Sequence, residues 1–196
     1  HPSYGWAAIL ALSQLAAPGD AGMMLLMNAI LGLIAVGAFR ATAARIFPGE
    51  EHQRALNLLT VACALHPVLL STLVQVNVDF GVYVFFFAMY AALLHDRYDW
   101  AAVAGTFLAF SKETGAFAAA ALVAVEVLRR LTAPELRALP WPSRVARVTP
   151  VWPALLPLLL FGAYLLWWSS GVHARGAIWK HDWNRSAADE IGRAHV

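Results

Sequence analysis

Apolar runs without a formal charge constrain this chain more than any other feature of its sequence. The hydrocarbon core of a bilayer is about 30 Å thick, and a helix needs roughly 20 apolar residues to cross it. The runs at 21–39, 55–78 and 148–172 are about this long, and the run at 80–94 is somewhat shorter. We therefore predict an all-α fold, a polytopic transmembrane helical bundle.

The composition indicates the same class of protein. The chain is 60% hydrophobic and 13% charged, with a mean hydropathy of +0.60, whereas soluble domains contain about 25% charged residues. The net charge is only +2, and the basic residues fall between the apolar runs, which argues against nucleic-acid binding. The single cysteine, Cys63, lies within an apolar run, so the chain cannot form an internal disulfide or a thiolate metal cluster.

The polarity of the chain divides it into four segments. Residues 1–20 hold a short apolar run that stops at a Pro-Gly pair, which predicts an interfacial helix on the outer face. The transmembrane region follows at 21–172, and a polar outer-face segment at 173–189. EIGRAHV at 190–196 back-translates, with one choice of codons, to a widely used sequencing adapter, so we interpret it as a non-biological tail. Because the chain starts with His1 and not Met, we expect truncation at both ends.

The distribution of Lys and Arg predicts the orientation in the membrane. If consecutive runs alternate sides, one face collects nine basic residues: Arg40, Arg45, Arg54, Arg97, Arg129, Arg130, Arg137, Arg144 and Arg147. The other face collects four: Lys112, Arg175, Lys180 and Arg185. The face with nine should be cytoplasmic. Asp20, Asp79, Lys112 and Glu113 then lie on the outer face.

This orientation requires a tight hairpin over residues 100–128. One continuous helix of that length would be about 45 Å long, at 1.5 Å per residue, and would place Arg97 and Arg129 on opposite sides. Ser111 and Thr114 can cap a new helix, and Gly115 lies beside the charges. We therefore predict that the chain reverses at Lys112 and Glu113.

Asp79 is the first candidate for a functional residue. It stands in QVNVDFG, between two apolar runs, and the simplest interpretation is a hydrated turn. A carboxylate at membrane depth costs roughly 2.5 to 3.5 kcal/mol on insertion scales and usually faces a cavity or a partner. In the functional interpretation, Asp79 holds a divalent metal cation or orients a sugar hydroxyl.

Lys112 and Glu113 allow the same two interpretations. They are either a solvated hairpin tip or, for Lys112, a ligand for the phosphate of an amphiphilic substrate. Glu113 is expected to be a solvated neighbour.

Other polar residues have structural interpretations. The His66-Pro67 pair predicts a bend within its apolar run, and Asn28 predicts a hydrogen bond between helices. The stretch GAIWKHDWN at 176–184 fits an interfacial aromatic belt or a contact with sugar or lipid phosphate. The sequence contains no glycine-rich phosphate loop and no Ser-His-Asp set, which argues against ATP hydrolysis within it.

The order of these elements resembles the membrane-embedded GT-C glycosyltransferases of the protein-mannosyltransferase and aminoarabinose-transferase type. Four elements carry the resemblance, and they span the chain from residue 1 to about 170: HPSYGW at 1–6, FRATAARIF at 39–47, ALHPVLLSTLVQVNVD at 64–79 and LAFSKETG at 108–115. Each element is loose by itself, and Ser3 replaces the commoner second proline of the first.

The resemblance implies an enzyme that transfers a sugar from a polyprenyl-phosphate donor to a lipid, glycan or protein acceptor. The reaction would take place at the outer face of a bacterial inner membrane. His1, Asp79 and Lys112 would contact substrate, Asp79 would help to hold a divalent metal, and Lys112 would neutralise the departing phosphate. The family's principal catalytic aspartate precedes the His-Pro element, so we expect it upstream of His1 and expect this fragment to be inactive.

Two other classes of protein remain open. A transporter or flippase of an amphiphilic substrate would also use intramembrane charges, but it predicts an internal repeat, and the two halves show no convincing self-similarity. A non-catalytic membrane scaffold would tolerate replacement of both Asp79 and Lys112.

Overall fold

The computed structural model describes residues 4–74, 78–133 and 139–169, and its elements in these ranges are all helical. The elements are α1 (Tyr4–Ala16), α2 (Ala21–Ile46), α3 (Glu50–Ala64), α4 (Pro67–Leu73), α5 (Val78–Leu94), α6 (Tyr98–Ser111), α7 (Glu113–Thr132), α8 (Trp141–Val148), the 3₁₀ segment η2 (Thr149–Leu155) and a helix over 156–169. The predicted all-α class is therefore confirmed. The described residues up to Leu159 belong to one compact unit, and those from Leu160 belong to a second.

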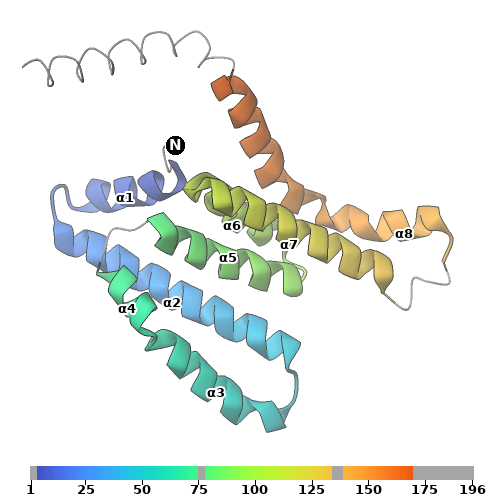
Figure 1. The fold of residues 1–196 in the computed structure, drawn as a ribbon, viewed down its shortest axis with the longest axis horizontal. Coiled ribbons are helices and arrows are strands. Elements are labelled where there is room, and N and C mark those ends of the chain that lie inside the picture. The colour runs from blue at the N-terminus through green and yellow to red at the C-terminus, as the bar shows by residue number, and fades with distance from the viewer. Residues whose placement is uncertain (1–3, 75–77, 134–138, 170–196) are drawn as a thin grey trace, which may run out of the picture. The chain divides into compact units, whose positions relative to one another are not determined.

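Helix α5 is at the centre of the first unit. It packs between α2 and α6, and α7 packs against α6 (Figure 1). The largest side chains of this core are almost fully buried: Phe80, Met89 and Leu93 of α5 and Leu108 of α6 are each at most 1% exposed. Close packing of these side chains supplies many van der Waals contacts, so α5 holds the neighbouring helices together.

In the part of the chain that the structure describes, two helices are long and apolar enough to cross a membrane: Ala21–Ile46, which is α2, and Trp141–Ser169, which begins with α8. Helix α5 has 17 residues and is apolar but shorter. Large apolar side chains on α2 remain exposed, among them Leu26, Ile30, Leu33 and Ile34. A soluble surface normally breaks up such a stripe with polar residues.

The predicted reversal of the chain at Lys112 is confirmed. Lys112 has extended backbone angles, φ −162° and ψ 157°, between the last residue of α6 and the first of α7. The predicted side-chain caps are wrong. Ser111 donates its hydroxyl to the Phe107 carbonyl inside α6, at 2.6 Å, and α7 begins without a side-chain cap. The backbone N–H of Gly115 instead donates to the Lys112 carbonyl at 2.9 Å.

The contacts define two ends of this helical unit. Lys112 lies beside Asp79 in the first turn of α5. At the opposite end, Arg45 near the C-terminus of α2 donates to the carbonyl of Leu94, the last residue of α5, at 3.3 Å. Helices α2 and α5 therefore run in the same direction, and Asp20, the N-cap of α2, belongs to the end that holds Asp79.

The predicted connections need two corrections. The run at 55–78 is not one bent helix, because α3 ends at Ala64 and α4 begins at Pro67. Proline lacks an N–H and disfavours helical geometry in the preceding residue. The segment at 40–54, between the apolar runs at 21–39 and 55–78, is expected to be a loop, but α2 continues to Ile46 and α3 begins at Glu50. Arg40 extends the contact between these two helices by donating to Gln53 and Asn57 of α3, at 2.8 and 3.0 Å.

Gly115 allows the closest backbone approach in the hairpin. A Cβ atom on this residue would lie 2.0 Å from the Leu108 carbonyl oxygen of α6. No side chain fits at that distance, so any larger residue must push the start of α7 away from α6.

We expect Gly115→Ala to destabilise the fold by about 3 kcal/mol, at the upper end for overpacked sites. Gly37→Ala is the matched control, because a Cβ there has no neighbour within 4 Å and alanine is the better helix former, by up to about 1 kcal/mol. Unfolding followed by circular dichroism in a mild detergent measures both changes. Equal stability of the two variants would contradict the close packing of this hairpin.

Candidate functional site

Asp79 and Lys112, both predicted as site residues, form a direct ion pair. Lys112 Nζ lies 2.6 Å from Asp79 Oδ1, and the two residues are 33 positions apart in the sequence. The side chains of Lys112 and Asp79 are 42% and 62% exposed, respectively. An ion pair this exposed contributes about 1 kcal/mol or less, so a ligand can replace either partner at small cost.

A cavity of about 600 Å³ opens beside Asp79. Residues of α2, α3, α4 and α5, and His66 between α3 and α4, form its walls, which are mainly apolar: Phe39, Leu59, Ala62, Cys63, His66, Leu69, Thr72, Asp79, Phe80 and Tyr83. Its polar lining residues are partly engaged with the protein, since Cys63 Sγ lies 3.3 Å from Tyr83 Oη and Thr72 donates to the Leu69 carbonyl. The cavity therefore combines a largely apolar interior with one exposed carboxylate.

The sequence prediction did not find this cavity. It interpreted His66-Pro67 as a bend only, and it gave no role to Cys63 or Tyr83. The break between α3 and α4 brings His66 and Cys63 to the cavity wall. A histidine directly before a proline in an apolar run was the available signal.

Asn28 forms the predicted hydrogen bond between helices. Its Nδ2 donates to the Leu73 carbonyl at the end of α4, at 3.2 Å, and the residue is fully buried. The bond ties the short helix α4, which forms part of the cavity wall, to α2.

Several predictions lie outside the described residues: the substrate contact of His1, the outer-face segment at 173–189 with its stretch at 176–184, and the non-biological tail at 190–196. The described ranges contain no group of three His, Cys, Asp or Glu residues suited to a metal ion. Asp79 as a metal ligand therefore stays a prediction. Glu113 is exposed, and its interpretation as a solvated neighbour stays a prediction.

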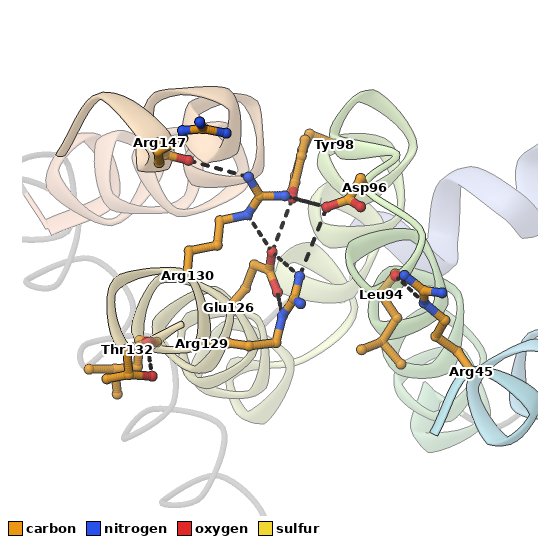
Figure 2. A network of polar contacts seen from close by, with 10 residues as sticks. Arg45, Leu94, Asp96, Tyr98, Glu126, Arg129, Arg130, Thr132 and Arg147 are labelled. Atoms are coloured by element: carbon orange, nitrogen blue, oxygen red, sulfur yellow. Dashed lines mark hydrogen bonds and ion pairs between the residues drawn. The ribbon is translucent and has the colours of Figure 1, made fainter. Parts of the chain in front are cut away.

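A second polar cluster lies at the opposite end of α6 and α7 (Figure 2). Glu126 is only 3% exposed and accepts hydrogen bonds from Tyr98, Arg129 and Arg130, at 2.7 to 3.0 Å. Arg130 also pairs with Asp96 and lies over the Tyr98 ring, 4.9 Å from its centroid. Two arginines and two carboxylates thus neutralise each other here.

The turn after α5 supplies Asp96 to this cluster. Asp96 has a positive φ of 57°, a left-handed conformation that aspartate tolerates better than most residues. The sequence prediction assigned Arg129 and Arg130 to the cytoplasmic face and gave no role to Asp96, Tyr98 or Glu126. An acidic residue three and four positions before two arginines was the signal.

No known protein family, curated protein or solved structure matches this chain.

We expect Glu126→Gln to destabilise the fold by about 2–3 kcal/mol, because it removes the buried charge opposite Arg130 while half-exposed Arg129 stays solvated. Asp99→Asn, an exposed charge in the first turn of α6, should cost about 1 kcal/mol or less. Denaturant unfolding of both variants in detergent makes the comparison. Equal effects would mean that the cluster does not hold the hairpin to the turn after α5.

Proposed function

We propose that the chain is part of a multi-pass membrane glycosyltransferase. It would transfer a sugar from a polyprenyl-phosphate donor to a lipid, glycan or protein acceptor at the extracytoplasmic face. The observation that carries the proposal is the Lys112–Asp79 ion pair beside a largely apolar cavity. A substrate that fits this combination has a long apolar chain and a charged head.

Exposed apolar helices support the membrane location. Helix α2 and the helical region over 141–169 have the length and composition of membrane spans. The stripe of large apolar side chains on α2 would face lipid. The end that holds Asp79 and Lys112 would then face outward, and the arginine-rich end would face the cytoplasm.

The proposed chemistry is direct displacement at the anomeric carbon. The acceptor oxygen or nitrogen forms a bond to this carbon while the bond to the phosphate oxygen breaks, and the lipid phosphate leaves with the electron pair. A general base, expected to be a carboxylate in this class of enzyme, would take the acceptor proton. Lys112 would stabilise the negative charge that develops on the leaving phosphate.

The ion pair implies an exchange of partners. The phosphate takes the place of the Asp79 carboxylate at Lys112 Nζ, and the carboxylate becomes available to a sugar hydroxyl or a metal ion. The low cost of separating an exposed pair makes this exchange feasible.

Cys63 gives a direct test of lipid binding, because it lines the cavity and is the chain's single cysteine. We expect polyprenyl phosphate to slow its alkylation. Lys112→Gln should weaken the protection by about fivefold, the loss expected for one exposed charge-assisted contact. Asp79→Asn should strengthen it, because the competing carboxylate is gone.

Uncharged polyprenol is the control ligand in this experiment. Lys112→Gln should leave its protection unchanged, since it has no phosphate to bind. If polyprenol and polyprenyl phosphate protected Cys63 equally in the unmodified chain, Lys112 would not be a phosphate ligand.

In the full-length protein, Lys112→Ala should lower the rate of sugar transfer by about a hundredfold, as removal of one preorganised charge-stabilising donor does elsewhere. Asp79→Ala should also lower the rate of sugar transfer, although this variant should still bind the lipid phosphate well. Glu113→Gln is the control and should transfer normally. Unchanged transfer by both alanine variants would favour a non-catalytic scaffold.

A further inference from the structure

We propose that Phe39 and Leu59, at the inner end of the cavity, limit recognition of a lipid to the part of its apolar chain nearest the phosphate. The inner end is the end furthest from Asp79. This inference rests on the proposed function, because it takes the lipid phosphate to lie at Lys112. The cavity would then distinguish lipids by their head and their first isoprene units, and not by the total length of the chain.

Helix α5 gives the depth of the cavity. Asp79 lies in its first turn, where its carboxylate pairs with Lys112. Phe87, eight residues further along the same helix, packs edge-on against Phe39 of α2, with the ring centroids 5.6 Å apart. Eight residues of helix rise about 12 Å, so Phe39 lies roughly this far below Asp79. The depth is less than half of the hydrocarbon core of a bilayer, which is about 30 Å thick.

Helix α3 gives the same position for the inner end. It follows α2 and runs back toward the end that holds Asp79 (Figure 1). Cys63 Sγ of α3 lies 3.3 Å from Oη of Tyr83, which is one helical turn after Asp79 on α5. Leu59 lies one turn before Cys63 on α3, and so one turn deeper. Phe39 and Leu59 are therefore the deepest residues that line the cavity.

Polar side chains close the cavity beyond this point. Arg40, the residue after Phe39, donates from Nη2 to Gln53 and Asn57 of α3, at 2.8 and 3.0 Å, which joins α2 directly to α3. An apolar chain that continued in this direction would have to break these hydrogen bonds and remove water from a guanidinium. Both changes are unfavourable, so the lipid chain cannot extend further between the two helices.

The distal part of a long chain therefore leaves the protein at Leu59. This side chain is 49% exposed although it lines the cavity. Leu56 is the one buried residue of α3, so this helix separates the cavity from the surrounding lipid only in part. Beyond Leu59 the chain contacts bilayer lipid, which is as apolar as the chain itself. Isoprene units beyond this point add no affinity.

The test compares geranylgeranyl phosphate with undecaprenyl phosphate in protecting Cys63 from alkylation, in the purified chain in neutral detergent micelles. Both chains, when extended, are longer than the depth from Asp79 to Phe39. At equal mole fraction in the micelle, we expect the two lipids to protect equally. Protection several-fold stronger with undecaprenyl phosphate would overturn this inference and leave the proposed function standing.

Leu59→Trp fills the inner end of the cavity. It should weaken protection by both lipids to the same extent, by about tenfold, within the range for an overpacked site. Leu58→Trp is the matched control, because Leu58 is 65% exposed and does not line the cavity. This variant should be protected like the unmodified chain.

Each protection is taken relative to alkylation of the same variant without lipid, and circular dichroism checks that the helices are retained. Equal effects of the two tryptophan variants would contradict a role of Leu59 at the inner end. A loss in Leu59→Trp that affects undecaprenyl phosphate alone would contradict it as well. No protection of the unmodified chain by either lipid would overturn both this inference and the proposed function.

Discussion

The close approach of α7 to α6 at Gly115 is the constraint on which the arrangement of the candidate site depends. The Leu108 carbonyl of α6 lies where the side chain of residue 115 would begin. Because the helices approach so closely, only one residue connects the end of α6 to the start of α7. Lys112 is that residue. Its extended backbone and its position at the tip bring its ammonium group to the first turn of α5, where Asp79 lies. The absence of a side chain at Gly115 thus allows the hairpin geometry that places the Lys112 ammonium group beside the Asp79 carboxylate.

The two ends of the α6–α7 hairpin use charge in different ways. At the Lys112 end, a single exposed pair can separate at little cost. At the other end, Glu126 is buried and satisfied by several donors, and loss of one partner would leave a charge uncompensated. The buried cluster fixes the hairpin against the turn after α5, while the exposed pair stays available for exchange.

The sequence predicted much of the helical framework. Charge-free runs located α2 and α5, and the alternation of successive runs across the membrane placed Asp79 and Lys112 at the same end. Asn28 was predicted to bond another helix because a lone amide in an apolar run needs a partner. Helix ends were predicted less well: α2 continues past Arg40, whose guanidinium reaches amide side chains of α3.

The cavity and the Glu126 cluster could not be predicted, because both depend on contacts between distant parts of the chain. Periodicity places Cys63 and Tyr83 on separate helices, but only packing brings their polar atoms to 3.3 Å. In the same way, the sequence EVLRR suggests local ion pairs, yet the burial of Glu126 needs Tyr98 from another helix.

The break at His66-Pro67 has a mechanical consequence for the cavity wall. In a continuous helix the carbonyl of Cys63 would accept a hydrogen bond from residue 67. It accepts one from the His66 N–H instead, at 3.2 Å, so this carbonyl is satisfied although the helix is broken. Helices α3 and α4, joined in this way, can meet at different angles without breaking the hydrogen bonds inside either helix. The angle between α3 and α4, and with it the width of the cavity, is therefore set by packing contacts such as the Asn28 hydrogen bond to the Leu73 carbonyl and not by one continuous helix.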